Sequence, residues 1–363
     1  MKKTIKTILV IILLTVSQVS FGQTDNEEKA YAKGMEAIKL MEGGEIDKSI
    51  KLLEEAKKLD PKNINYPYEI AYAHYLDKNY KSAIKILESL TKHANDNDRV
   101  HQLLGNSYSM NEQREKAIEA YEKGLKKFPN SGSLYLERGN MELFIKEYGK
   151  ALGYYEKGIE VNPSFPSNYY WAARIYCGSD EEVWGMIYGE IFMNIERNTK
   201  RTAEISKLLF ETYNNEIKIT SDSSYSVSFS KSASINVKSL SEPNKMKLPF
   251  GIGVYEPTIM FSMIDIKSIN LQSLHKLRSN FIDNYFKNGH NKNYPNILFN
   301  YQKEVKEAGQ LEAYNYWILM KGSEDEFGKW RTANKEKWEN FVKWFNDNGL
   351  KVTDSNKFYS SQY

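Results

Sequence analysis

A spacing of 34 residues recurs along the first half of this 363-residue chain. Three pairs of matching residues stand 34 positions apart, namely Gly105 and Gly139, Ala117 and Ala151, and Pro129 and Pro163. The spacing extends backwards, since Ser49 and Ala83 occupy the same column as Ala117. A fixed period of this length indicates a repeated supersecondary unit, which constrains the fold more than any local propensity does.

The columns of the repeat have a physical explanation. Small residues in two columns let a pair of helices approach closely, because larger side chains would hold the helix axes apart. Proline ends the second helix, because its ring clashes with the preceding turn and it has no N–H to donate. Each pair leaves one apolar face uncovered, so the pairs must stack on one another.

The period and its columns resemble the tetratricopeptide repeat, a helix–turn–helix unit. The resemblance covers residues 28–165, and a degenerate fifth copy begins at Pro166. It implies a mainly α fold, a solenoid of about four to five helical hairpins stacked into a right-handed superhelix. The alternative, an ordinary amphipathic helical bundle, does not account for copies that stay in register.

The resemblance also implies a binding surface. In this family the first helix of each unit lines the inner, concave face, and its exposed positions bind partners. The register maps these positions to Tyr68, Tyr72, Tyr75, Gln102, Asn106, Ser109, Leu136, Asn140, Leu143, Tyr170 and Arg174. Tyrosine and arginine carry much of the energy at protein interfaces, and amides pair with an extended backbone. The alternative role of each residue is packing between units, above all for Tyr68 and Tyr75.

Some members of the family bind a C-terminal carboxylate through a set of Lys, Arg and Asn side chains. The matching positions here hold Gly34, Ile38, Gln102 and Glu137. We therefore expect no receptor for a chaperone tail.

The N-terminus has the pattern of a secretory signal. Lys2, Lys3 and Lys6 precede an apolar run from Ile8 to Val16, and small residues flank Phe21 before Gln23. The pattern predicts a signal peptide at residues 1–22 and export to the periplasm or the extracellular space. The apolar run is short for a membrane span, so we expect no transmembrane segment in the mature chain. An uncleaved anchor is the alternative.

The charge balance bears on the class of partner. The formal net charge is +3, and the predicted leader holds three lysines and no acid, which leaves 3 − 3 = 0 for the mature chain. A nucleic-acid partner needs a basic stripe that neutralises phosphates. We therefore expect no nucleic acid among the partners.

The residues that usually carry chemistry do not form a motif. The single cysteine, Cys177, cannot form an internal disulfide, and we interpret it as a structural thiol rather than a nucleophile. None of the five histidines belongs to a metal-ligand motif. The sequence predicts no catalytic residue, no metal and no cofactor.

Two further segments follow the repeats. Residues 166–215 keep a helical pattern and are predicted to be the degenerate unit with capping helices. Within them, Arg197, Lys200 and Arg201 form either an anion site or, as we prefer, a solvated helix junction.

Residues 216–363 differ in kind. Alternating apolar residues predict strands at 217–220, 225–230 and 234–238. Apolar stripes then predict helices at 266–286, 299–306, 311–320 and 327–348. The segment therefore reads as a small α+β domain.

These features predict an exported scaffold or adaptor without catalytic activity. Its partner is a protein or peptide held in the concave groove, and peripheral association with an envelope complex is a further expectation. The alternative is an envelope enzyme with its chemistry in residues 216–363 and repeats that recruit the substrate. The acidic residues Glu256 and Asp265 are the candidate pair for that alternative, although nothing in the sequence sets their distance.

Overall fold

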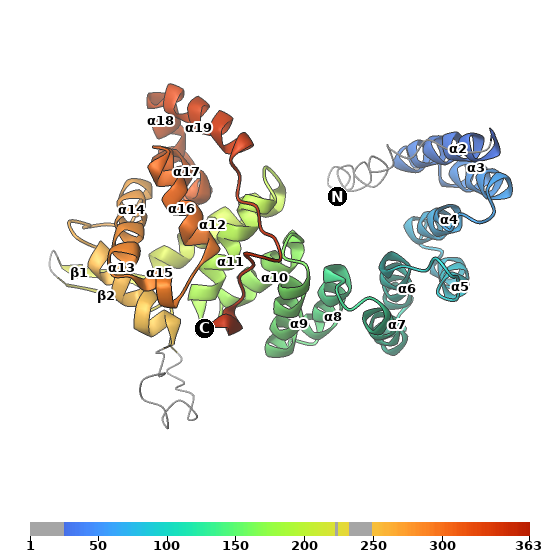
Figure 1. The fold of residues 1–363 in the computed structure, drawn as a ribbon, viewed down its shortest axis with the longest axis horizontal. Coiled ribbons are helices and arrows are strands. Elements are labelled where there is room, and N and C mark those ends of the chain that lie inside the picture. Colours follow the sequence, from blue (N-terminus) through green and yellow to red (C-terminus); the bar gives the residue numbers. More distant parts are fainter. Residues whose placement is uncertain (1–24, 222–223, 232–248) are drawn as a thin grey trace. The chain divides into compact units, whose positions relative to one another are not determined.

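A computed structural model describes residues 25–221, 224–231 and 249–363 (Figure 1). The predicted leader, residues 1–22, and the third predicted strand, residues 234–238, lie outside the described residues. The chain divides into two compact units, Met1–Met141 and Glu142–Tyr363.

The described part of the first unit consists of helices that follow one another in antiparallel pairs (Figure 1). Each helix from α2 to α6 packs against the next one in sequence, and α4 also packs against α6. The helices are α2 (Asp25–Glu42), α3 (Ile46–Leu59), α4 (Asn65–Leu76), α5 (Tyr80–Leu90), α6 (Asp98–Met110), α7 (Arg114–Lys127) and α8 (Gly132–Phe144), the last of which continues into the second unit.

The 34-residue period reappears in the backbone of the turns. The turns within successive pairs contain one left-handed residue each, namely Gly44, Lys78, Glu112 and Lys146, with φ of 84°, 63°, 60° and 62°. Just after each of them a backbone N–H bonds back to a carbonyl five residues earlier, as in the bond from Asn79 to His74. This Schellman-type closure satisfies the last carbonyls of the first helix. The helix–turn–helix unit expected from the sequence is therefore present.

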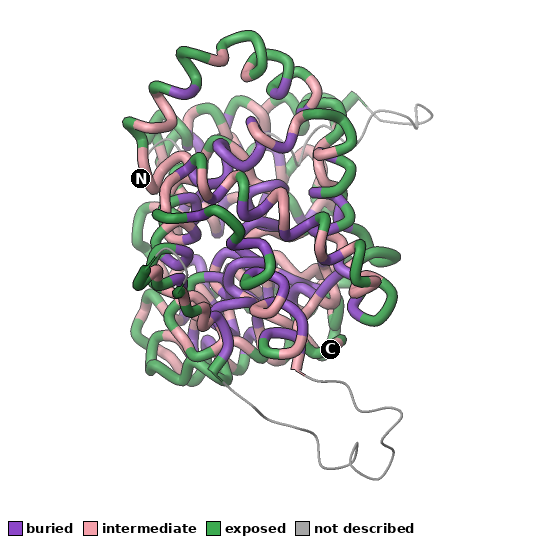
Figure 2. Tube along the Cα trace, turned by 90° about the vertical axis from the view of Figure 1, so that its left-hand side faces the viewer, coloured by how far each residue is buried: buried purple, intermediate pink, exposed green. Residues whose placement is uncertain are grey.

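The small columns lie where the helices are closest. Ala71, Ala83 and Ala117 are fully buried in the core of the first unit, and Figure 2 colours the buried stretches of the chain purple. A Cβ built on Gly105 would stand 2.1 Å from the ring of Tyr121. Only glycine fits there, because α6 and α7 are in contact at that point.

The second unit is also mainly helical. After the end of α8 it contains α9 (Tyr148–Val161), α10 (Pro166–Tyr176), α11 (Glu182–Ile195), α12 (Lys200–Glu216), α13 (Glu256–Ser262), α14 (Leu271–Lys287), α15 (His290–Asn293), α16 (Ile297–Glu307), α17 (Leu311–Leu319), α18 (Glu324–Ala333) and α19 (Lys335–Asp347). No helix among the described residues is long and apolar enough to cross a bilayer.

The described residues include one sheet, formed by the antiparallel strands β1 (Ile217–Ser221) and β2 (Ser224–Val227). The first two predicted strands are thus confirmed, although β2 ends three residues earlier than the alternation suggests. Beyond it, the fully buried Phe229 packs edge-on against Tyr213 and Tyr255. The apolar residue at position 229 extends the alternating pattern beyond the end of β2, but its side chain packs in a core formed with helices and not on the sheet.

Two helix predictions need correction. The predicted helix at 327–348 is wrong, because α18 ends at Ala333 and α19 begins after Asn334. The predicted helix at 266–286 begins late, at Leu271, because Asn270 and Ser273 form a capping box there. The apolar stripe alone did not reveal either boundary.

Helix α11 is buried along almost its whole length and joins the core of the second unit. Its Glu190 binds Arg278 of α14, and its Asn194 donates to the hydroxyl of Tyr314 on α17. Segments 166–215 and 216–363 therefore share one core.

Candidate partner-binding wall of the first unit

Three first helices of successive pairs carry most of the predicted binding residues. We call the residues of α4, α6 and the first-unit part of α8 that are not buried the α4–α6–α8 wall. The helices α4 and α6 are in contact, and Gln102 of α6 donates from Nε2 to Glu137 Oε1 of α8 at 3.0 Å. The first-unit positions on these helices that are not buried therefore lie on neighbouring helices.

Half-buried tyrosines of α4 form one side of the wall. The rings of Tyr72 and Tyr75 stack with centroids 6.4 Å apart. The Arg99 guanidinium stands 4.4 Å from the ring centre of Tyr68 and 3.5 Å from Glu69 Oε1. Burial raises the pKa of Tyr68 to about 12, so its phenol is neutral at physiological pH. This side therefore offers neutral aromatic surface, and its Glu69–Arg99 charges are paired.

The centre of the wall is a carboxylate. Glu137 accepts hydrogen bonds from Gln102 at 3.0 Å, Asn106 at 3.5 Å and Asn140 at 3.1 Å. Burial raises the pKa of Tyr75, and the charge of Glu137 on α8 adds to this effect. The Tyr75 phenol therefore interacts electrostatically with the carboxylate. In the described part of the chain, no cation lies within ion-pair distance of Glu137.

The amides of the wall are thus oriented by the protein itself. The Tyr121 hydroxyl, which is buried, donates to Asn106 Oδ1 at 2.5 Å. Asn106 therefore bonds to Tyr121 on one side and to Glu137 on the other, and it has little capacity left for a partner backbone. The sequence expectation had assigned backbone recognition to these amides.

The remaining predicted residues differ in exposure. Ser109 is half-buried on α6, whereas Leu136 is buried on α8. A buried side chain presents little surface to a partner, so the structure gives Leu136 a packing environment.

Three of the predicted residues belong to the second unit. Leu143 is half-buried at the end of α8. Tyr170 is only 4% exposed and donates its hydroxyl proton to Glu204 Oε2 at 2.5 Å. Arg174 is exposed and donates to the Tyr170 hydroxyl at 3.1 Å. Of these residues, Arg174 presents the most surface.

The sequence reasoning missed the charges of the wall. Glu69 and Glu137 occupy one column of the 34-residue register, two periods apart. Their shared column could have shown that both point to the same face as the tyrosines. The sequence motif by itself marks Glu137 only as a residue that cannot bind a carboxylate.

The structure also locates the candidates for other chemistry. Among the described residues there is no cluster of three or more metal-ligating side chains. Burial raises the pKa of Cys177 to about 12, which suppresses its thiolate at neutral pH. Glu256 accepts from the backbone of Ser230, while Asp265 pairs with Lys276 at 3.3 Å.

The basic residues at the α11–α12 junction already have partners. Arg197 donates to the backbone carbonyls of Asn194 and Phe345, and Arg201 pairs with Glu196. Lys200 lies 3.9 Å from Glu204. These contacts favour a structural junction over an anion site.

Comparison with known families agrees with the helix pairs. Two family models, each described as tetratricopeptide repeat, match residues 40–107 and 98–131. Residues 40–131 of this chain are tetratricopeptide repeats (TPRs). Such repeats form a protein-interaction fold, so this protein is a protein-interaction scaffold in the general sense. No curated protein sequence matches it.

Several solved structures resemble parts of this protein. PilF of Pseudomonas aeruginosa is 18% identical with a TM-score of 0.43, over 52% of this chain and 85% of PilF. A thermophilic TPR protein of Thermus thermophilus is 14% identical with a TM-score of 0.42, over 50% of this chain and 98% of its own. PilW, described as a type IV pilus biogenesis factor, is 18% identical with a TM-score of 0.41, over 50% of this chain and 84% of PilW.

Proposed function

We propose that this protein is an exported, non-catalytic scaffold whose first unit holds a segment of another protein against the α4–α6–α8 wall. The segment is extended or helical, and it carries a lysine or arginine that pairs with Glu137. The observation that carries this proposal is the Glu137 carboxylate, which three amides orient and which no described cation neutralises.

The electrostatics of the wall support a basic segment. Its charged residues are Glu69, Asp98, Arg99 and Glu137, so the sum is 1 − 3 = −2. Arg99 and Glu69 neutralise each other. Asp98 accepts from the Ser131 hydroxyl at 2.7 Å, and the remaining charge is at Glu137. A cation bound there would gain a charge-assisted hydrogen bond, and such bonds are stronger than those between neutral groups. An acidic segment would be repelled, which gives the wall a means of discrimination.

The tyrosines of α4 supply apolar contact area beside the charge. Tyr72 and Tyr75 are held by mutual stacking, so ordering them on binding costs little conformational entropy. Truncation of such an aromatic anchor typically costs about 2 kcal/mol or more of binding free energy at an interface. Anchoring rings beside one fixed charge suit a short segment that carries a basic residue.

The test is capture of partners from envelope extract by the immobilised full-length protein. Glu137→Lys should lose the partners that the wild type retains, and Glu137→Gln should retain them weakly. Glu115→Lys is the matched control, because Glu115 is exposed on the second helix α7, outside the wall. Recovery of the same partners by Glu137→Lys and wild type would refute the assignment of the wall. Capture should also weaken at high salt, because the pair is partly exposed.

Export is tested separately. The cell fraction that contains the protein should be periplasmic or extracellular, and N-terminal sequencing should begin at Gln23. A protein that stays in the cytoplasm with its N-terminal residues intact would contradict the proposed export. It would not affect the proposal that the α4–α6–α8 wall binds a partner.

A further inference from the structure

The carboxylate of Glu137 has most of its hydrogen-bonding capacity already in use. A carboxylate offers about four lone-pair sites, shared between its two oxygens. Glu137 Oε1 accepts from Gln102 Nε2 at 3.0 Å and from Asn106 Nδ2 at 3.5 Å, and Oε2 accepts from Asn140 Nδ2 at 3.1 Å. Within the described part of the molecule, these bonds use both sites of Oε1 and one site of Oε2. One acceptor site, on Oε2, is left.

The Asn106 amide is held beside Oε1 by a second bond. The buried Tyr121 donates its hydroxyl proton to Asn106 Oδ1 at 2.5 Å, which turns Nδ2 toward Glu137. The bond from Nδ2 to Oε1 is long, but the amide still occupies the space that a further donor to Oε1 would need. A partner therefore reaches this carboxylate through Oε2.

Lysine and arginine differ in what they require of a carboxylate. A guanidinium presents its N–H groups as a rigid planar fork, and its strong pairing mode makes one bond to each carboxylate oxygen. That mode needs an open site on both oxygens, and the amides fill Oε1 of Glu137. An ammonium is a compact point charge with rotatable donors, so one bond to Oε2 suffices. Its other N–H groups stay in water, because Glu137 is only half-buried.

The tyrosines beside the carboxylate suit the stem of a long basic side chain. Tyr72 and Tyr75 stack on each other, and the charge of Glu137 acts on the Tyr75 phenol. The methylene groups of a lysine can lie along such rings while its ammonium extends to the carboxylate. A guanidinium also stacks on aromatic rings. The rings therefore favour either residue, and the open acceptor site decides between them.

We propose that the α4–α6–α8 wall selects lysine over arginine in the segment that it binds. This inference rests on the proposed function, because it requires a basic residue of the partner at Glu137. The lysine ammonium donates to Glu137 Oε2, and its stem lies along Tyr75. An arginine at the same place keeps one of its two parallel bonds, so peptides that carry it should bind about tenfold more weakly.

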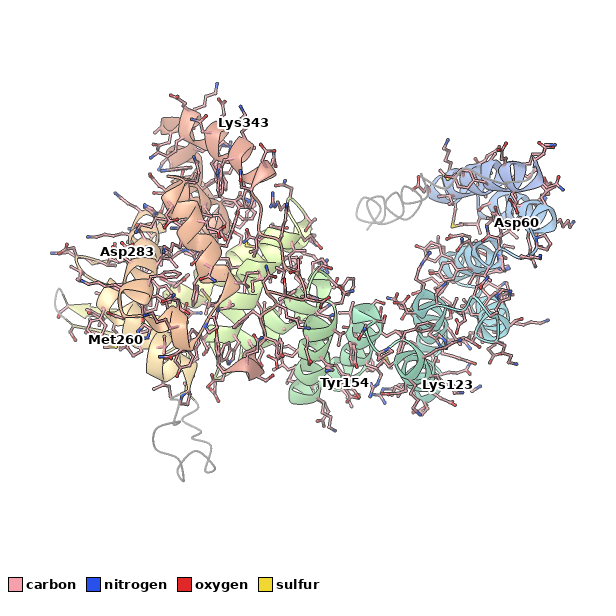
Figure 3. All side chains as sticks on the ribbon, viewed as in Figure 1. Asp60, Lys123, Tyr154, Met260, Asp283 and Lys343 are labelled. Atoms are coloured by element: carbon pink, nitrogen blue, oxygen red, sulfur yellow. The ribbon has the colours of Figure 1, made fainter. Side chains whose placement is uncertain are left out.

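The test uses a library of heptapeptides with lysine, arginine or norleucine at the centre and random residues other than lysine and arginine elsewhere. Both ends are blocked, so the only ammonium is that of the lysine side chain. Peptides that bind to the immobilised full-length protein are counted by mass spectrometry. Lysine peptides should be enriched over arginine peptides, and Glu137→Gln should abolish the difference. Asp60→Asn is the matched control that should keep it, because Asp60, labelled in Figure 3, follows α3 outside the wall.

A second variant tests the cause of the selection. Gln102→Leu removes the 3.0 Å bond and opens a site on Oε1. Arginine should then regain its second bond, and the ratio of bound lysine to arginine peptides should fall several-fold. Gln272→Leu is the matched control, because Gln272 is exposed on α14 in the second unit, and its ratio should equal that of the wild type. Circular dichroism should show that both variants are folded.

The outcomes separate this inference from the proposed function. Equal binding of lysine, arginine and norleucine peptides would refute the pairing at Glu137, and with it the proposed function of the wall. Arginine peptides that bind as well as lysine peptides or better, and more tightly than norleucine peptides, would overturn the selection of lysine and leave the proposed function intact. A lysine preference that Gln102→Leu leaves unchanged would refute the open acceptor site as its cause.

Discussion

Replacement of Arg278 by methionine should destabilise the second unit by about 3–5 kcal/mol, the cost of leaving one charge of a buried pair alone. Arg278 and Glu190 are 6% and 3% exposed. Two guanidinium nitrogens donate to the carboxylate at 2.6 and 2.8 Å, and Nε donates to Asn315 at 2.7 Å. Burial lowers the pKa of Arg278, but the Glu190 charge outweighs it and holds that pKa above its ordinary value.

The double-mutant cycle separates the pair from its surroundings. Glu190 also accepts from Gln302 and from the Tyr314 hydroxyl at 2.8 Å, so Glu190→Gln keeps an acceptor there while removing the charge. The variant with both Arg278→Met and Glu190→Gln should recover about 2–3 kcal/mol of the summed cost, because neither unpaired charge remains.

Urea unfolding followed by tryptophan fluorescence is the assay. All six tryptophans follow Glu142 in the sequence, so the signal reports the second unit alone. A loss below about 1 kcal/mol for Arg278→Met, or single-mutant costs that simply add, would refute the claim that this pair holds α11 against α14.

Three further predictions concern the core and the titratable groups. Burial lowers the pKa of His275 below its ordinary value of 6.5, so as the pH falls the unfolded chain binds a proton at this histidine before the folded chain does. The free energy of unfolding should therefore drop below about pH 6.5. His275→Gln should reduce the difference between the urea midpoints measured at about pH 7.5 and 5.5, and an unchanged difference would contradict this. Cys177 is half-buried, and burial raises its pKa to about 12. It should therefore resist iodoacetamide at about pH 7.5 in the native protein and react in urea, as mass spectrometry would show, and rapid native labelling would refute the raised pKa. Gly105→Ala should destabilise the first unit by about 1–3 kcal/mol in unfolding followed by far-ultraviolet circular dichroism, because the added Cβ would stand 2.1 Å from the Tyr121 ring. Gly153→Ala is the control and should be neutral or stabilising, because no atom lies within 4 Å of the added Cβ.

The sequence alone predicted the repeat because the repeat is a local pattern. Small residues, turn residues and prolines act within one helix pair or between neighbouring pairs, so their spacing encodes the packing directly. The recurrence of left-handed residues at Gly44, Lys78 and Glu112 shows the same period in the backbone. The positions of Tyr68, Tyr72 and Tyr75 on α4 followed from that register as well.

The state of each wall residue did not follow from the register. Whether Asn106 is free or bonded depends on the Tyr121 hydroxyl and on Glu137, which belong to two other helices. Burial of Leu136 and Tyr170 is likewise set by neighbouring helices. A column position gives the face of a helix, whereas hydrogen bonding and exposure depend on what packs against that face.

The second unit was decided mainly by tertiary structure. Its strands β1 and β2 could be predicted because period-two alternation is local. The Glu190–Arg278 pair joins residues 88 positions apart, and the Tyr301 hydroxyl reaches the Asn348 carbonyl 47 positions away. No period links such residues, so the sequence determined which helices form, and only the packing of the whole unit determined which side chains meet.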